Sequence, residues 1–87
     1  MIKYEDLLDE LNGAKKYLSW HKQTQIKDTT ENKNDREFLY FADDELRHLN
    51  FNLRKVDKEI QQHFISTHAK EMLTLSIDIT DEMYKGW

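Results

Sequence analysis

The 87-residue sequence contains no cysteine, no proline and only two glycines. Without cysteine the chain can form neither disulfides nor thiolate metal sites, which excludes the common ways of stapling a small fold. The scarcity of proline and glycine argues against a β-sandwich or barrel, because the many turns of those folds use both residues. The composition, 38% hydrophobic and 34% charged residues, fits a single helical domain over residues 1–87 with narrow apolar stripes.

Long apolar runs and clustered cations are lacking as well. No run approaches the ~18 apolar residues of a membrane span, and residues 1–10 carry acids where a signal peptide carries a basic segment. The net charge of −4 disfavours a phosphate-binding surface, because neutralising a nucleic-acid backbone needs clustered lysine and arginine. We therefore expect a cytoplasmic protein that binds neither membranes nor nucleic acid directly.

Between residues 35 and 69, apolar residues recur at steps of three and four, which is the pattern of a heptad seam along a helix. The seam consists of Leu39, Ala42, Leu46, Leu49, Leu53, Val56 and Ile60. Asn34 with Glu37 resembles a capping box, and Asp35 is an equally good cap. The pattern predicts one long helix over 35–69, with a kink near residues 50–52 that folds the second half back as the alternative.

A similar stripe predicts a first helix over residues 4–22. Its members are Tyr4, Leu7, Leu11, Ala14, Leu18 and His21. Gly13 costs ~1 kcal/mol inside a helix, which predicts close packing against the second helix at this point. The polar segment 23–34 is a predicted loop, with a short extended piece at 24–29 as an option. Two such helices joined by this loop form an antiparallel hairpin.

The two predicted helices differ in length, at about 28 Å and about 51 Å. Val56, Ile60 and Phe64 therefore run past the end of the first helix, and an uncovered stripe of this kind predicts self-association or a partner. Five aromatic residues also lie off the seams and indicate either a second buried face or a binding surface. These are Tyr17, Trp20, Tyr40, Phe41 and Phe51.

Residues 72–79 change period, because four apolar residues alternate strictly with polar ones, as in a half-buried strand. The four are Leu73, Leu75, Ile77 and Ile79. Thr80 then begins a terminal helical turn over 80–86. The alternative continues the helix through Thr80, Tyr84 and Trp87. A lone strand must pair its backbone groups, so the tail is expected to add to a second copy or to a sheet of the target protein.

Candidate chemistry is sparse. Glu45 and His48 have the spacing used in di-iron bundles, but those sites need two such motifs and further glutamates. His63, at a seam position, fits a residue that sets register in an assembly better than a catalytic one. The sequence contains no glycine-rich phosphate loop, nucleophile elbow or zinc spacing. We therefore predict no catalytic residue, no metal and no cofactor.

The predicted fold is mainly α: an antiparallel helical hairpin with an overlong second helix and a short C-terminal β-strand tail. The leading functional expectation is a small non-enzymatic interaction protein of inhibitor, antitoxin, immunity or adaptor type, as phages and mobile elements encode. It would bind another protein, itself as a homodimer, or both. The alternatives are an acidic mimic of nucleic acid, built on the acids of 5–10 and 43–45, and a purely structural homo-oligomer. The residues expected to make the contact are Val56, Ile60, Phe64, Leu73, Leu75, Ile77, Ile79, Tyr84 and Trp87.

Overall fold

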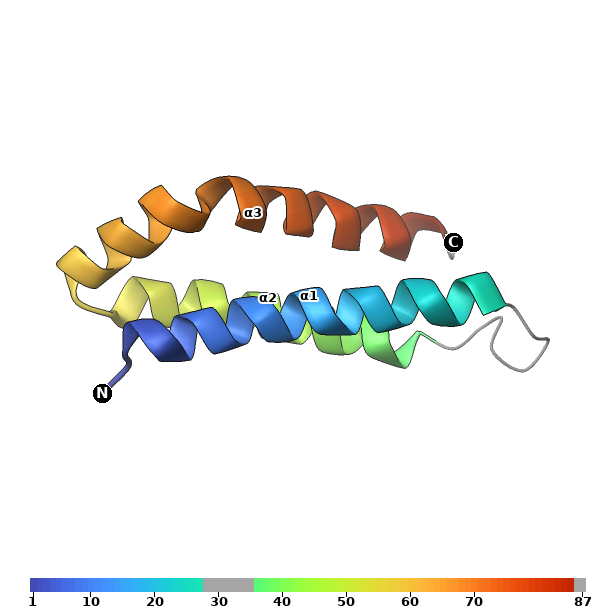
Figure 1. Cartoon of the computed structure of the whole chain (residues 1–87), viewed down its shortest axis with the longest axis horizontal. Helices are drawn as coiled ribbons and strands as arrows, with labels where there is room; N and C mark the ends of the chain where they lie inside the picture. The colour runs from blue at the N-terminus through green and yellow to red at the C-terminus, as the bar shows by residue number, and fades with distance from the viewer. Residues whose placement is uncertain (28–35, 86–87) are drawn as a thin grey trace.

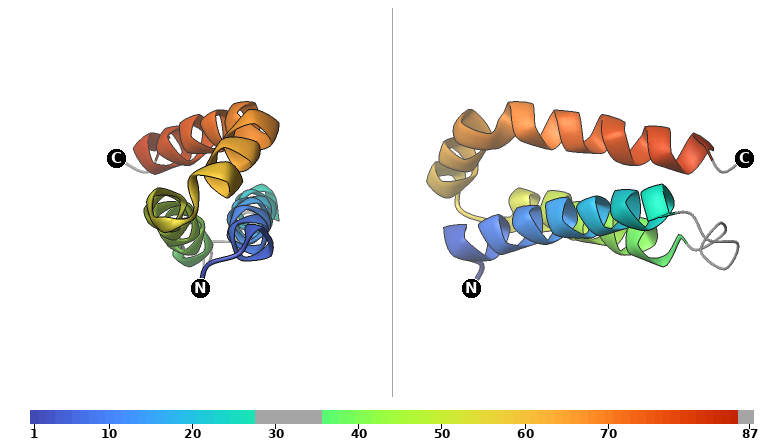
Figure 2. Two further views of the ribbon diagram at one scale, coloured as in Figure 1. Left: turned by 90° about the vertical axis from the view of Figure 1, so that its left-hand side faces the viewer. Right: turned by 45° about the vertical axis from the view of Figure 1, so that its right-hand side comes forward.

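The computed structural model describes residues 1–27 and 36–85, with backbone only for 25–27. These residues form three helices, α1 (Tyr4–Lys27), α2 (Glu37–Lys55) and α3 (Lys58–Lys85), and no strand. The helices run up, down and up again, so that α3 returns along the α1–α2 hairpin (Figure 1). Seen end-on, they stand at the corners of a triangle (Figure 2). None of the described helices has the length and the apolar character needed to cross a bilayer.

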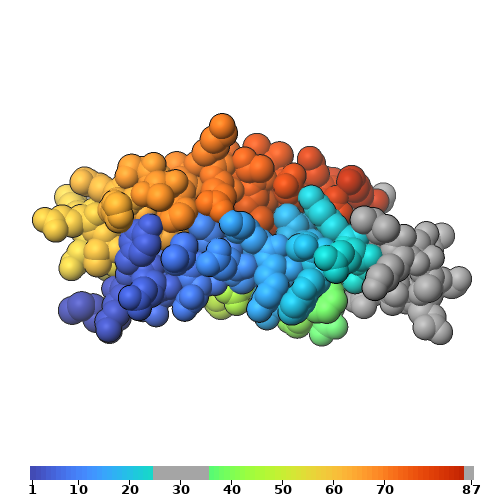
Figure 3. Space-filling model, viewed as in Figure 1, coloured from blue at the N-terminus to red at the C-terminus, as the bar shows by residue number. Residues whose placement is uncertain are grey.

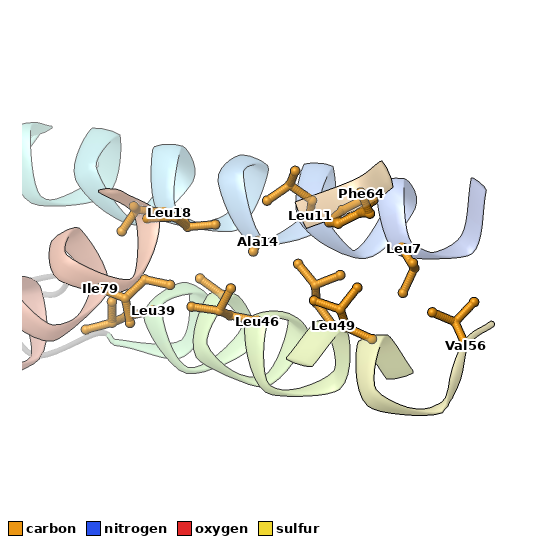
Figure 4. Close-up of a cluster of buried hydrophobic side chains, with 13 residues drawn as sticks. Leu7, Leu11, Ala14, Leu18, Leu39, Leu46, Leu49, Val56, Phe64 and Ile79 are labelled. Carbon is orange, nitrogen blue, oxygen red and sulfur yellow. The ribbon is translucent and has the colours of Figure 1, made fainter. Parts of the chain in front are cut away.

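The core forms where the two heptad stripes face each other. The α1 side chains Leu7, Leu11 and Ala14 are fully buried, as are Leu39 and Leu49 of α2. Figure 4 shows the two rows facing each other, with Phe64 of α3 near the Leu7 end and Ile79 near the Leu39 end. Among the described residues, twelve buried hydrophobic side chains of the three helices and Val56, between α2 and α3, form this cluster. Helix α3 therefore closes a core that the hairpin alone would leave open.

Gly13 lies where α1 comes close to α2. A Cβ atom at this position would stand 3.2 Å from Oε2 of Glu45, tighter than ordinary van der Waals contact. One helical turn away, the side-chain amide of Asn52 donates to the carboxylate of Glu10 at 3.0 Å. The close approach predicted at Gly13 is thus confirmed, and the neighbour is the carboxylate end of a glutamate.

The prediction of one continuous helix over 35–69 is wrong, because the helix is interrupted at Val56 and Asp57. Val56 has an extended conformation, with φ −75° and ψ 160°, and its N–H still donates to the carbonyl of Asn52. Asp57 precedes α3, where aspartate is a favoured cap, and its carbonyl accepts the N–H of Gln61 at 2.8 Å. The Gln61 side chain donates to the carbonyl of Leu53 at 2.9 Å, which satisfies one of the orphan acceptors at the end of α2.

Burial explains why the break is favoured. In a continuous helix Val56, Ile60 and Phe64 would have had no cover from α1. In the folded-back chain Phe64 has no exposed surface and Val56 is 8% exposed. Fully burying a side chain of this size is worth about 1.5–3 kcal/mol, and several side chains gain it, since Leu75 and Ile79 of α3 are buried as well. Each backbone hydrogen bond lost at the break costs only about 0.5–1.5 kcal/mol net, so burial favours the break. The alternative with a folded-back second half describes the chain better, although the break lies after residues 50–52.

The strand predicted over 72–79 is also wrong, because these residues are helical in α3. The alternation of apolar residues contains two interleaved pairs at spacing i, i+4. Leu75 and Ile79 form the pair that faces the core, at 5% and 2% exposed, whereas Leu73 and Ile77 form a pair on the solvent side. A helix satisfies its own backbone groups, and a lone strand would have needed a partner for them.

The ends of the helices differ from the sequence prediction as well. Residues 23–27, expected in a loop, extend α1, and residues 80–85 continue α3 without a new start. Helix α2 begins after Arg36, which makes no side-chain capping hydrogen bond. The extended piece considered at 24–29 is wrong for residues 24–27, which are helical in α1. Its last two residues and the predicted caps Asn34 and Asp35 lie outside the described residues.

Candidate interaction surfaces

The nine residues predicted to make a protein contact are separated by the fold. Four are buried in the chain's own core: Val56, Phe64, Leu75 and Ile79. Ile60 is half-buried against that core, and Trp87 lies outside the described residues. Three remain exposed, all on α3: Leu73, Ile77 and Tyr84. The expectation that Val56, Ile60 and Phe64 are left uncovered is therefore wrong, because α3 folds back and turns this stripe inward.

The three exposed residues form a line on the solvent side of α3, which we call the α3 outer stripe. Leu73, Ile77 and Tyr84 are 63%, 53% and 72% exposed. Their spacing of i, i+4 and i+11 places them on one face of a helix. Leu75 and Ile79 occupy the opposite, buried face. Helix α3 is thus apolar on two opposite sides, and only one of them is covered by its own chain.

A second apolar surface, the aromatic patch, lies across α1 and α2. It consists of Tyr17, Trp20, Phe38 and Phe41, whose ring centroids lie 5.4 to 6.5 Å apart in a connected set of contacts. Trp20 and Phe41 are each 40% exposed, and the other two rings are half-buried. The geometries are mostly edge-to-face or tilted, which aromatic pairs prefer. Each ring is therefore held in place by its neighbours and still presents an edge or face to solvent.

Lys16 adds a charge at the rim of the aromatic patch. Its ammonium nitrogen lies 5.1 Å from the centroid of Trp20 and 5.3 Å from that of Tyr17. These are cation–π distances, and such contacts are worth about 0.5–1 kcal/mol at exposed sites. The lysine therefore packs on both rings and gives the apolar patch a positively charged edge.

Sequence reasoning found part of the aromatic patch. It singled out Tyr17, Trp20 and Phe41 and missed Phe38, although Phe38 and Phe41 have the same i, i+3 spacing as Tyr17 and Trp20. The other two aromatic residues that it named lie elsewhere: Tyr40 and Phe51 are 55% and 56% exposed. The alternative of a second buried face holds in part, since Tyr17 and Phe38 are half-buried and Trp20 and Phe41 are each 40% exposed. The alternative of a binding surface stays a prediction.

A groove of about 690 Å³ lies between α1 and α3. Leu18 and Leu75 line it from either helix, and both are 5% exposed. Two ion pairs span it, one between Lys15 and Glu71 and one at 3.8 Å between Lys22 and Asp78. The ribbons of the two helices lie well apart in Figure 1, but their side chains meet along this side of the molecule in the space-filling view (Figure 3). Ion pairs between α1 and α3 therefore cross the groove, and its polar rim helps to hold α3 against α1.

Polar contacts hold the C-terminal end of α3. The guanidinium Nη2 of Arg36 donates to the backbone carbonyl oxygens of Glu82 and Met83, at 3.0 and 2.8 Å. The carboxylate of Glu82 lies 3.3 Å from Nε2 of the buried His21. The residue immediately before α2 and a buried histidine of α1 thus fix the end of α3 together.

A second polar group joins the start of α1 to the middle of α3. The hydroxyl of Tyr4 lies 3.0 Å from Nε2 of His68, and Nδ1 of the same ring lies 3.2 Å from Glu71. His63, expected to set register in an assembly, is exposed, and its ring centroid lies 5.2 Å from that of Tyr4. Histidine and carboxylate contacts in the middle and near the C-terminal end of α3 therefore add to its apolar packing.

These contacts shift the pKa of two carboxylates on α3. The hydrogen bond from Lys15, and next the contact with His68, hold the pKa of Glu71 below its ordinary value of 4.5. Burial raises the pKa of Glu82, but the hydrogen bond from Lys85 and the charges of Lys85, His21 and Lys22 together outweigh it. The pKa of Glu82 is therefore also below 4.5. Both groups stabilise the docked α3 in their ionised form.

The two residues considered for metal binding, Glu45 and His48, lie in different environments. Glu45 lies against Gly13, and His48 is exposed. Over residues 1–27 and 36–85, no three histidine, aspartate or glutamate side chains gather as a metal ion would require.

No protein-family model, curated protein or solved structure matches the chain.

Proposed function

We propose that this chain is a small non-enzymatic interaction protein that acts in the cytoplasm by occupying the surface of a partner protein, as an inhibitor, antitoxin, immunity protein or adaptor does. The observation that carries this proposal is the aromatic patch. The largest contiguous apolar patch on the surface of a monomeric protein is often a functional one. Tyrosine, tryptophan and phenylalanine are also the side chains enriched at protein interfaces.

The patch is suited to binding because it is ordered before the partner arrives. Tyr17 contacts the rings of Trp20, Phe38 and Phe41, so these side chains lose little conformational freedom on association. Such freedom costs about 0.5–1.5 kcal/mol for each immobilised side chain. The best-supported partner surface is therefore a concave apolar pocket that takes the edges of Trp20 and Phe41, with an acidic group to face Lys16.

Mimicry of nucleic acid has less support. Asp43 accepts a hydrogen bond from Arg47 at 2.8 Å, and Glu10 accepts one from Asn52 at 3.0 Å. Each of the two acidic clusters is thus partly engaged within the chain. A mimic would need its carboxylates directed outward as a row, and its binding would weaken steeply with salt.

The test compares variants of the patch with variants of aromatic residues outside it that are somewhat more exposed, at 55% and 56% against 40%. Trp20→Ser and Phe41→Ser remove the exposed edges of the patch, and Tyr40→Ser and Phe51→Ser are the matched controls. Each variant is first checked for helical circular dichroism and is then used as bait in the native host, with quantitative comparison to the wild type. A partner that the wild type and the controls retain is purified, and its affinity for each variant is measured by titration calorimetry.

We expect the patch variants to bind that partner at least 30-fold more weakly, which corresponds to the ~2 kcal/mol of a binding hot spot. The controls should bind within about threefold of the wild type. Equal losses in controls and patch variants, or unchanged binding by folded patch variants, would overturn the assignment.

A further inference from the structure

We propose that the solvent face of α3 pairs with the same face of a second copy of this chain, as an antiparallel two-helix seam. The aromatic patch is not involved, so this interface is separate from the proposed partner surface. The starting observation is the α3 outer stripe, in which Leu73, Ile77 and Tyr84 are 53% to 72% exposed.

The stripe has the spacing of a heptad seam. Leu73, Ile77, Thr80 and Tyr84 follow one another at steps of four, three and four, which are the steps between alternating a and d positions. The same steps continue towards the N-terminus through Lys70 and Ser66, and all six residues are exposed. Ile77 and Tyr84 are then a positions, and Leu73 and Thr80 are d positions.

Helix α3 carries apolar residues on two opposite sides, which also favours pairing with a second copy. Phe64, Leu75 and Ile79 face the core, and the outer stripe lies on the opposite side. A helix that is apolar on opposite sides is typical of a helix covered on both. The hairpin covers one side of α3, and the other is left for a second molecule.

The seam is complementary to itself, which is the requirement for a two-fold interface between identical chains. In an antiparallel pair, a positions face d positions of the other helix. When Ile77 of one copy faces Leu73 of the second, the two-fold axis places Leu73 of the first opposite Ile77 of the second. The same register places Tyr84 opposite Ser66 of the second copy, so that the largest side chain meets one of the smallest.

Charge and size support this register. Lys70 faces Thr80 of the second copy and lies beside its Asp81, an exposed carboxylate one residue further along. The two lysines of the dimer are separated by ten helical positions, about 15 Å, beyond the Debye length at physiological salt. The residues that flank the stripe, Ala69, Thr74 and Ser76, are small, which lets the two helices approach closely.

The seam predicts a weak dimer. Only the two central layers, formed by Leu73 and Ile77, are apolar on both sides. A single helix pair of this kind buries less than the ~1,600 Å² of a standard interface. We therefore expect a monomer–dimer equilibrium with a dissociation constant in the micromolar range.

Sedimentation equilibrium from about 5 to about 500 µM, a range that brackets micromolar dissociation, tests the proposal. The wild type should change from monomer to dimer across this range. Ile77→Lys should weaken the dimer at least 30-fold, because it places a charge in the central apolar layers. Ile65→Lys is the matched control on the same helix, since Ile65 is 40% exposed but outside the seam, and it should dimerise within about threefold of the wild type.

The register is tested separately by cross-linking, for which the absence of cysteine is convenient. Ser76 lies next to its own copy across the two-fold axis in the antiparallel register, whereas the two Ser66 residues lie far apart. A short bismaleimide should therefore cross-link Ser76→Cys and leave Ser66→Cys uncross-linked. Cross-linking of both variants would show a parallel pairing and would overturn the proposed register.

Charge reversal provides a further measure of orientation. Lys70→Asp should weaken dimerisation by bringing two acids together across the interface, and Lys70→Asp with Asp81→Lys should restore it. A wild type that is monomeric at the highest concentration, or an Ile77→Lys variant that dimerises normally, would overturn the proposal. The patch variant Trp20→Ser should dimerise like the wild type, so the two proposals succeed or fail independently.

Discussion

The side chain of Arg36 caps α3 at Met83: its guanidinium donates to that backbone carbonyl at 2.8 Å and to the preceding carbonyl, of Glu82, at 3.0 Å. The last four carbonyls of a helix have no partner within the helix, and cations near this end also complement the helix dipole. Arg36 stands immediately before α2. One side chain therefore ties the start of the second helix to the end of the third.

Replacing Arg36 with methionine should destabilise the protein by about 1.5–3 kcal/mol, the range for hydrogen bonds that involve a charged group. Methionine keeps much of the aliphatic stem and removes both donors. Urea unfolding followed by circular dichroism measures the loss, and amide hydrogen exchange should localise it to the last turns of α3. Arg54→Met, an exposed change of the same charge on α2, is the control. Equal losses in the two variants would show that charge alone is responsible.

Phe64→Ala should be among the most damaging single substitutions, with a loss of about 3–5 kcal/mol, because it empties a fully buried position in the core. Its neighbour Ile65 is 40% exposed, and Ile65→Ala should change stability by less than about 1 kcal/mol. Denaturant midpoints of the two variants give the comparison. If Phe64→Ala were as mild as the control, α3 would not be docked through this residue.

Gly13→Ala should stabilise the protein, by somewhat less than the ~1 kcal/mol by which alanine exceeds glycine in a helix. The added Cβ would lie 3.2 Å from Oε2 of Glu45, and this flexible carboxylate can move by a few tenths of an ångström. In a Glu45→Ala background the gain should reach its full value, since the obstructing group is gone. A loss of stability in both backgrounds would mean that the two helix backbones, and not Glu45, limit the space.

Stability should fall in acid because of Glu71 and Glu82. Both carboxyl groups have a pKa below 4.5 in the folded chain, so the unfolded chain binds more protons as the pH drops. Their contribution is complete above pH 4.5 and is lost as the pH falls through the lower folded values. The unfolding free energy, measured from about pH 3 to pH 7, should therefore decline less steeply in Glu71→Gln with Glu82→Gln than in the wild type. Glu59→Gln removes a carboxylate at an exposed position of the same helix and is the matched control, which should change the slope less than the double variant does.

The aromatic patch illustrates the limit of sequence reasoning about surfaces. Spacing placed Tyr17 with Trp20, and it could have placed Phe38 with Phe41, because residues three apart share a helix face. Whether the two pairs meet depends on how α1 and α2 are rotated about their axes, which side-chain packing sets. Single helix faces were thus within reach of the sequence, and their combination across helices was not.

What the sequence determined by itself is the pairing of α1 with α2. Leu7, Leu11 and Leu18 on one helix and Leu39 and Leu46 on the other repeat with helical spacing, and pairing the two helices buries both rows. The tertiary structure alone decided the break at Val56 and the helical state of residues 72–79. In both places local pattern allowed two conformations, since the heptad spacing continues across the break and strict alternation also contains i, i+4 pairs. The choice came from burial over long sequence distances: only when α3 turns back do Phe64, Leu75 and Ile79 leave water, and a helix is the form in which they can do so with every backbone group satisfied.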